Sequence, residues 1–215
     1  MKLKSEFLIE INNRGFIYQS TDLEDLDDIM NKNKITGYIG FDITSDSLHI
    51  GSLVQLMLLH WFDYYNNKTI ALVGGGTTLV GDPSGKDSSR KILSEVEINN
   101  NIKSIERTFT RFIDLKNALI INNHDWLSEI NYINFLREIG SKMTLNKMLT
   151  FESIKNRLDR EQPLSILEFN YMLLQAYDFL HLNTHYECIL QMGGSDQWGN
   201  ILSGIDLIRR SNKNR

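Results

Sequence analysis

Three polar residues stand at helical spacing in an otherwise apolar stretch of the sequence. Tyr171, Gln175 and Asp178 are separated by four and three residues, so a helix places them on one face. Their neighbours from Met172 to Leu180 are almost all apolar and would bury that face, where an ionised carboxylate needs a partner. Two interpretations are open: Asp178 accepts an internal hydrogen bond from a loop, or it lines a pocket whose ligand supplies the donor.

A histidine stands where another helix is expected to begin. The tripeptide HisIleGly occupies positions 49–51, and the free backbone N–H groups and dipole of a helix start attract anions. The imidazole of His49 can donate to a phosphate oxygen, and Gly51 lets a flat ring approach the backbone. A packed or capping histidine remains the commoner explanation of this tripeptide taken alone.

The turn from Gly74 to Arg90 is rich in glycine, yet it matches neither common nucleotide-binding motif. GlyAspProSerGlyLys at 81–86 has too few residues between its glycines for a P-loop, and Asp87 stands where that motif needs Ser or Thr. Gly74–Gly76 follows a predicted strand, but Leu79 occupies the last glycine position of a dinucleotide fingerprint. Both motifs are therefore excluded.

A third polar turn runs from Gln191 to Gln197. Asp196 and Gln197 lie at the start of the last predicted helix. They are candidates for ligand contacts, although Ser195 or Asp196 could equally serve as a helix cap.

Strands and helices alternate along the chain. Apolar runs predict strands at 36–41, 69–73, 118–121 and 187–192. Helical periodicity predicts helices at about 50–65, 94–114, 165–181 and 196–210, with helical patterns from about 127 to 160 before Pro163 breaks the chain. Ser94 and Glu97 match a capping box. This alternation predicts an α/β fold with a doubly wound parallel sheet, whose ligands bind at the carboxyl ends of the strands.

Composition excludes several other classes of protein. The chain has 215 residues, of which 41% are hydrophobic and 23% charged, and its net charge is −4; wholesale disorder and a generally basic nucleic-acid-binding surface are thus excluded. The single cysteine, Cys188, lies in a predicted buried strand, cannot form an internal disulfide and indicates a reducing compartment. The sequence has no zinc-ligand spacing, signal peptide or membrane-spanning run. We therefore expect a cytoplasmic protein without a metal site or a membrane association.

Four long stretches together resemble one family. They are YIGFDITSDSLHIG (38–51), ALVGGGTTLVGDPSGK (71–86), YMLLQAYDF (171–179) and QMGGSDQWGN (191–200). In this order they resemble the catalytic domain of bacterial-type tyrosyl-tRNA synthetases, which are class I aminoacyl-tRNA synthetases with a Rossmann-like fold. The resemblance covers essentially the whole chain and implies a two-step ligase reaction. Tyrosine and ATP form tyrosyl-adenylate and pyrophosphate, and the tyrosyl group then passes to the terminal ribose of tRNA(Tyr).

The resemblance also implies roles for individual residues. His49 and Thr44 would contact the phosphates in the transition state, and Lys86 and Arg90 would meet pyrophosphate. The tyrosine-binding residues would be Tyr38, Thr77, Asp82, Tyr171, Gln175, Asp178 and Gln191. Tyr38 and Asp178 among them would bind the phenolic hydroxyl. The ATP-binding residues would be Gly40, Asp42, Thr44, His49, Gly51, Ser52, Gly194, Asp196 and Gln197. ATP is implied as a substrate accompanied by Mg²⁺, with no tightly bound cofactor.

One position departs from the family pattern. The usual HisIleGlyHis signature is HisIleGlySer here, with Ser52 in the last place. Serine can still donate a hydrogen bond but lacks the imidazole, so the phosphate role stays with His49. Gln55 follows one helical turn later and is a further candidate to face ATP.

The resemblance makes the segment from about 127 to 165 a connecting insertion that contributes to a homodimer interface, although an internal helical core would look the same. It also makes residues 1–215 an incomplete catalytic domain. The chain ends with four cations in its last seven residues and no closing glycine or proline, so we expect a cut within that domain. The KMSKS-type lysine loop and the C-terminal tRNA-binding domains would lie beyond Arg215, and a fragment without them should have impaired activity.

Two alternatives remain at this point. A tryptophanyl-type synthetase belongs to the same subclass, but an indole has no hydroxyl for Tyr38 and Asp178. A non-catalytic amino-acid or nucleotide-binding module descended from a synthetase would keep the same motifs without turnover.

Overall fold

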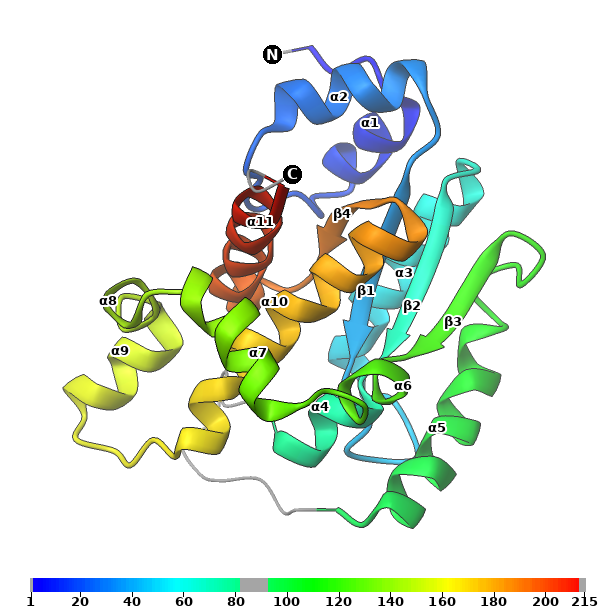
Figure 1. Ribbon diagram of the computed structural model, residues 1–215. Coiled ribbons are helices and arrows are strands. Elements are labelled where there is room, and N and C mark those ends of the chain that lie inside the picture. The colour runs from blue at the N-terminus through cyan, green and yellow to red at the C-terminus, as the bar shows by residue number, and fades with distance from the viewer. Residues whose placement is uncertain (1, 82–92, 213–215) are drawn as a thin grey trace.

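The protein is built around a parallel β-sheet of four strands (Figure 1). The computed structural model describes residues 2–81 and 93–212. The strands are β1 (Thr36–Phe41), β2 (Lys68–Val73), β3 (Ala118–Asn122) and β4 (Cys188–Met192). They lie in the order β3-β2-β1-β4, and each neighbouring pair is parallel. All four predicted strands are therefore confirmed, within one residue at each end.

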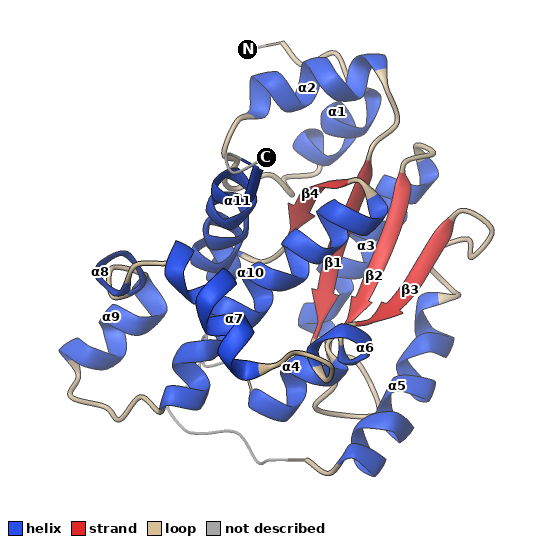
Figure 2. Ribbon diagram, viewed as in Figure 1, coloured by secondary structure: helices blue, strands red, loops and turns tan. Residues whose placement is uncertain are grey.

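Helices cover both faces of this sheet (Figure 2). One face packs against α3 (Ile50–Tyr64) and α5 (Glu95–Phe109), and the other against α6 (His124–Leu127), α10 (Ile166–Tyr186) and α11 (Trp198–Asn212). Successive strand residues point to opposite faces, so Ile39 packs in the first layer and Tyr38 in the second. The doubly wound α/β arrangement is confirmed. A membrane crossing would need a longer and more apolar helix than any in the described part of the chain.

Capping residues set the starts of two long helices. Ser94 and Glu97 form the predicted capping box at the start of α5. An equivalent box, which the sequence analysis did not identify, joins Ser165 and Glu168 at the start of α10, directly after the break at Pro163. α10 continues to Tyr186, five residues beyond its predicted end, because its apolar pattern continues past residue 181.

The structure differs from the predicted elements in three places. The segment 127–160 is a series of short helices with turns between them: α7 (Tyr132–Glu138), the 3-10 turn η1 (Gly140–Lys142), α8 (Leu145–Met148) and α9 (Glu152–Asp159). α5 ends at Phe109, and a 3-10 turn, η2 (Ser195–Gln197), precedes α11. The sequence analysis did not predict α1 (Glu6–Asn13), α2 (Leu23–Lys32) or α4 (Gly75–Val80), and α6 (His124–Leu127) ends where the predicted helical segment begins.

A buried carboxylate attaches the two N-terminal helices to each other. Asp27 of α2 is only 2% exposed, and its side chain accepts hydrogen bonds from the backbone N–H groups of Lys4 and Ser5 at the start of α1. Phe7, Leu8 and Ile11 of α1 then pack against the α3 side of the sheet. The N-terminal helices thus form an extension of the layer on that face.

Gly37 in β1 provides a test of this packing. A Cβ atom added there would lie 2.8 Å from Cζ of the fully buried Phe62, so Gly37→Ala should lower the free energy of unfolding by about 1–3 kcal/mol. At Gly40, in the same strand, an added Cβ meets nothing within 4 Å. Urea unfolding of Gly40→Ala should therefore give a stability within about 0.5 kcal/mol of the parent. Equal stabilities for the two variants would contradict the close approach of α3 to β1.

Candidate active site

A cavity of about 460 Å³ lies at the carboxyl ends of the strands, where the turns after β1, β2 and β4 meet α10. It brings together fifteen of the eighteen predicted site residues: Tyr38, Gly40, Asp42, Thr44, His49, Gly51, Ser52, Thr77, Tyr171, Gln175, Asp178, Gln191, Gly194, Asp196 and Gln197. Gln55 also lines it. The other three, Asp82, Lys86 and Arg90, lie outside the described residues. Residues from distant parts of the sequence thus share one concave surface at the edge where parallel α/β sheets bind ligands.

His49 caps the helix that leaves the first turn. Its Nδ1 accepts a hydrogen bond from the backbone N–H of Gly51 at 3.0 Å. A nitrogen that accepts carries no proton, so the neutral ring has its N–H at Nε2 and can donate from there. A Cβ atom at Gly51 would lie 2.8 Å from the His49 Cε1 atom, so the glycine is needed for this ring position. The capping and donor interpretations of His49 are therefore compatible.

Asp178 lies at the buried end of the cavity and is only 2% exposed. Its Oδ1 accepts from Nε1 of Trp126, and its Oδ2 accepts from Nδ2 of Asn123, each at 2.8 Å. The internal hydrogen bonds of the first interpretation are present, and the carboxylate also lines the cavity as the second requires. Each oxygen can accept more than one hydrogen bond, so capacity for a ligand donor remains.

Asn123, directly after β3, connects this carboxylate to the second turn. Its Oδ1 accepts from the backbone N–H of Gly76 at 2.8 Å, while its Nδ2 also donates to Oγ1 of Thr77 at 3.0 Å. Asn122 accepts in the same way from the N–H of Gly75 at 3.1 Å. The sequence alone did not identify this asparagine pair as part of the site. A polar side chain at the carboxyl end of a predicted strand was the available signal for Asn123, which is 1% exposed and lines the cavity.

Aromatic stacking holds the Trp126 indole in place. The ring of His181 lies parallel to it, with centroids 4.2 Å apart and an interplanar angle of 12°. Burial, followed by the nearby His185, lowers the pKa of His181 to about 4, so the stacked imidazole is neutral near pH 7. The stack orients the indole N–H toward Asp178.

Burial also perturbs the acids in this part of the site. It raises the pKa of Asp178 to about 7, against the opposing hydrogen bonds from Asn123 and Trp126. It raises the pKa of Tyr38 well above its ordinary value, and the negative charge of Asp178 adds to this effect. The Tyr38 phenol is therefore neutral, while Asp178 is poised between its neutral and ionised forms near neutral pH.

Two buried polar atoms of the cavity residues are unsatisfied. The hydroxyl of Tyr38 and Oε1 of Gln191 have no hydrogen-bond partner among the described residues. Both side chains line the cavity. Such orphaned groups cost free energy unless a ligand or water completes them, so the surface beside Asp178 suits a polar ligand group.

Amide side chains interact with one another at the cavity wall. Nδ2 of Asn200, which sequence reasoning missed, donates to Oε1 of Gln175 at 2.8 Å and to Oε1 of Gln197 at 3.1 Å. Nε2 of Gln197 donates to Oδ2 of Asp196 at 2.8 Å. The turn η2 begins at Gly194 without a side-chain cap, so neither Ser195 nor Asp196 caps this turn, and α11 begins after it at Trp198. The carboxylate of Asp196 and the amides of Gln175, Gln197 and Asn200 are thus joined by hydrogen bonds.

Two further contacts link the first turn to the helices. The hydroxyl of Tyr171 donates to Oδ1 of Asp42 at 3.3 Å, and the backbone N–H of Ile43 donates to Oγ1 of Thr78 at 3.0 Å. In the described ranges no three His, Cys, Asp or Glu side chains gather around a point where they could hold a metal ion. We therefore assign no residue to Mg²⁺.

Comparisons with known proteins agree with this geometry. Residues 30–215 match the family model described as tRNA synthetases class I (W and Y). The chain is 54% identical over 214 residues to a tyrosine-tRNA ligase of Pelagibacter ubique, covering 98% of this chain and 52% of that protein. It is 53% identical to a tyrosine-tRNA ligase of Ruegeria pomeroyi, covering 96% of this chain and 51% of that protein. The chain thus spans about half the length of the curated relatives it matches.

Solved structures of tRNA synthetases have folds similar to that of this chain. A C-terminally truncated mitochondrial tyrosyl-tRNA synthetase of Aspergillus nidulans superposes with a TM-score of 0.86 at 28% identity, covering 97% of this chain and 62% of that one. A tryptophanyl-tRNA synthetase of Plasmodium falciparum shares the fold, with a TM-score of 0.68 at 16% identity. The match covers 94% of this chain and 53% of that one. The family model matches most of the chain's length. The chain therefore belongs to the class I tRNA synthetases, in the family that the tryptophan and tyrosine enzymes share.

Proposed function

We propose that the chain forms the amino-acid-activating part of a tyrosine-tRNA ligase. The observation that carries this proposal is the buried pair of Tyr38 and Asp178, whose hydroxyl and carboxylate both line the cavity. A phenolic hydroxyl can donate to Asp178 and accept from Tyr38 at the same time, whereas an indole N–H can only donate. The pair therefore favours tyrosine over tryptophan. The names of the relatives that are about half identical support the same choice.

The amino acid would lie across the cavity with its ring toward Asp178. Its ammonium group would bind Asp82, Tyr171 and Gln175, with Thr77 nearby. The contact between Tyr171 and Asp42 supports this placement because it sets a phenol oxygen beside a carboxylate at the cavity wall. Gln191 and Gln197 would complete the surroundings of the reacting carboxylate.

ATP would bind over the turn that His49 caps. An oxygen of the tyrosine carboxylate attacks the α-phosphorus, the bond from that phosphorus to the β-bridging oxygen breaks, and pyrophosphate leaves with its electron pair. The Nε2–H of His49, the hydroxyl of Thr44 and the start of α3 would stabilise the charge that moves onto the phosphate oxygens. Lys86 and Arg90 would receive the pyrophosphate. Catalysis would then rest on positioning and electrostatics, without a covalent enzyme intermediate.

The nucleoside would lie toward the turn after β4. Gly194 and Asp196 would bind the ribose, and Gly51 would lie under the ribose or adenine. Gly40, Ser52 and Gln55 would line the remaining surface. Mg²⁺ would enter with the ATP phosphates.

Residues 1–215 would be part of a class I catalytic domain, with residues 127–165 as its connecting insertion. The lysine loop and tRNA-binding domains of the family would belong to the longer protein, which would then transfer tyrosine to tRNA(Tyr). We place this protein in the cytoplasm, since its one cysteine is fully buried and unpaired.

The insertion carries apolar side chains that support a homodimer. Tyr132 and Ile133 of α7 and Leu145 of α8 are each 62% exposed, and Ile166, which directly follows the insertion at the start of α10, is 78% exposed. Exposed large apolar side chains of this kind are suited to burial in a protein interface. A second copy of the chain would cover this surface.

Removing the carboxylate should abolish selection for tyrosine. In calorimetric titrations Asp178→Ala should lower tyrosine affinity and bring it close to that for phenylalanine. The reason is that a site built to hydrogen-bond a hydroxyl rejects the analogue that lacks it, a discrimination for which tyrosyl-tRNA synthetases are the standard example. Tyrosine-dependent ATP–pyrophosphate exchange should fall in parallel, from a level that we expect to be low in residues 1–215 alone.

Asp27 supplies the matched control for this experiment. It is another aspartate with 2% exposure, but within the described residues its side chain accepts hydrogen bonds only from the N-terminal backbone. Asp27→Ala should reduce stability while leaving the ratio of tyrosine to phenylalanine affinity unchanged. An unchanged ratio in Asp178→Ala would refute the assignment of the phenol pocket. Near-native pyrophosphate exchange by the parent chain would refute the proposal that residues 1–215 are an incomplete catalytic domain. Tyrosine binding by the longer protein without any exchange would favour a non-catalytic binding module.

The raised pKa of Asp178 makes tyrosine binding depend on pH. With a pKa of about 7, the ionised fraction in the free protein grows from about a tenth at pH 6 to about nine tenths at pH 8. Because the phenol donates to the ionised form, tyrosine affinity should rise about tenfold between these pH values. Phenylalanine affinity should not rise, and Asp178→Asn should remove the dependence. An equal tyrosine affinity at both pH values would contradict hydroxyl donation to this carboxylate.

Sedimentation tests the homodimer. The parent chain should sediment as a dimer at micromolar concentration, and Ile133→Asp should shift it toward monomer because it places a charge in the proposed interface. Val96→Asp is the control, since Val96 of α5 is 70% exposed but lies outside the insertion. A monomeric parent chain and a monomeric longer protein would overturn the proposal.

A further inference from the structure

Three stacked rings lead from the surface of α10 to the proposed phenol pocket. The imidazole of His185, which is exposed, stacks on that of His181 with ring centroids 4.1 Å apart and an interplanar angle of 25°. His181 stacks in turn on the indole of Trp126, at 4.2 Å and 12°. Two rings this close to one imidazole cover its opposite faces, so His181 lies between the other two. Neither histidine is among the described residues that line the candidate active-site cavity.

The indole of Trp126 is attached to α10 at two points. Its Nε1–H donates to Oδ1 of Asp178 at 2.8 Å, and its face contacts His181. Asp178 and His181 are three residues apart on this helix, so they lie on the same side of it. The hydrogen bond fixes where the N–H lies, but the ring can still turn about it. The stacked imidazole removes that freedom.

The orientation of the indole matters for the charge on Asp178. A hydrogen bond weakens steeply when the angle at its hydrogen departs from linear. The side-chain donors to this carboxylate within the described residues are Asn123 and Trp126, and both act to lower its pKa against the effect of burial. A tilted indole would leave the buried charge with one well-aligned donor, and the pKa of Asp178 would rise further.

We propose that His181 is a positioning residue for tyrosine selection: by stacking on Trp126 it keeps the indole N–H aimed at Asp178, and thereby keeps this carboxylate ready to accept the substrate hydroxyl. His181 acts through Trp126 and does not contact the substrate. The inference rests on the proposed function, because it concerns the same pocket.

His181 acts by contact and not by charge. Burial, followed by the nearby His185, lowers its pKa to about 4, so the ring is neutral at pH 6 and above. The phenols that interact with Asp178 are Tyr38 of β1 and Tyr177, the preceding residue of α10, and burial raises the pKa of each above its ordinary value of 10. Among Asp178, His181 and these two phenols, only Asp178 therefore changes its charge between pH 6 and pH 8.5.

Removing the flat ring should shift the pH dependence of tyrosine binding. His181→Leu fills the space without stacking. Losing a well-aligned donor to a charged group should raise the midpoint by about one pH unit. The ionised fraction of Asp178 at pH 7 would fall from about a half to about a tenth, so the ratio of tyrosine to phenylalanine affinity in calorimetric titrations should fall about fivefold. At pH 8.5 the two proteins should differ by less than about twofold, because Asp178 is then mostly ionised in both.

Three further variants separate stacking from general damage. His181→Phe keeps a flat ring and should restore the parent midpoint. His185→Leu removes the outer ring, together with its charge, and should also keep that midpoint because His181 still covers the indole. His60→Leu is the matched control on α3, where His60 lies beside Trp61 with ring centroids 5.5 Å apart. It should lower stability without changing the pH profile.

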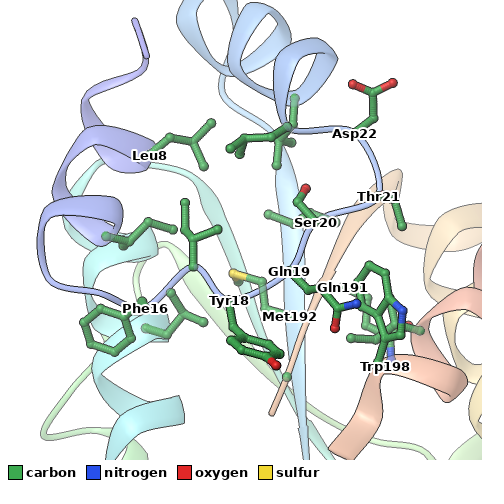
Figure 3. A pocket seen from close by; sticks show the side chains of 18 of the residues that line it. Leu8, Phe16, Tyr18, Gln19, Ser20, Thr21, Asp22, Gln191, Met192 and Trp198 are labelled. Atoms are coloured by element: carbon green, nitrogen blue, oxygen red, sulfur yellow. The ribbon is translucent and has the colours of Figure 1, made fainter. Parts of the chain in front are cut away.

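The indole N–H groups give a readout that needs no substrate. The chain has three tryptophans, so its proton–nitrogen correlation spectrum contains three indole signals. In His181→Leu the Trp126 signal should move, and its N–H should exchange with solvent about tenfold faster. Two internal references should stay unchanged: Trp61 on α3, and Trp198 at the wall of a second cavity beside β4 (Figure 3).

Three results would overturn the positioning role. They are an unchanged Trp126 signal in His181→Leu, a selectivity that this variant lowers equally at pH 7 and pH 8.5, and a midpoint that His185→Leu moves as far. Selective tyrosine binding by the parent with an unmoved His181→Leu profile would remove the positioning role alone. A parent chain that binds no tyrosine would remove the proposed function. The role of His181 would then be decided by the carboxyl titration of Asp178 in the free protein, where a raised midpoint supports it and an unmoved one overturns it.

Discussion

The buried carboxylate of Asp178 is the interaction on which the candidate site depends. Two N–H groups donate to it, yet burial still raises its pKa from 3.8 to about 7. That difference corresponds to about 4 kcal/mol against the ionised form. The protein alone therefore compensates the buried charge incompletely, and a ligand that brings one more donor gains from this deficit. The specificity for a hydroxyl that we propose would follow from the same imbalance.

This carboxylate also connects the parts of the fold that shape the cavity. Asn123 joins Asp178 to Thr77 and to the backbone of α4, and Trp126 joins it to α6 and the stacked His181. Because one asparagine serves both the carboxylate and the turn after β2, a shift of either would disturb the other. The end of β4 and the turn after it have a comparable double role, since residues 191–194 line both the candidate active-site cavity and a second cavity beside β4.

The sequence predicts the central fold well because its signals are local. Continuous apolar runs define the four strands, and the Ser94 box marks a helix start. α4 was missed because Gly75 and Gly76 disfavour a helix by themselves, and the asparagines at the end of β3 hold its first turn from 47 residues away. The roles of Asn123 and Asn200 also arise only from contacts distant in sequence. The motifs bring most predicted site residues to one cavity, while the pairing of Asp178 with Trp126 needs the folded chain.

A crystal structure of this chain with L-tyrosine would test the central claim most directly. The account predicts that the phenolic oxygen lies within hydrogen-bond distance of both the Asp178 carboxylate and the Tyr38 hydroxyl, with the contacts from Asn123 and Trp126 retained. Tyrosine bound with its ring elsewhere in the cavity, or with its ammonium group rather than its hydroxyl at Asp178, would contradict it.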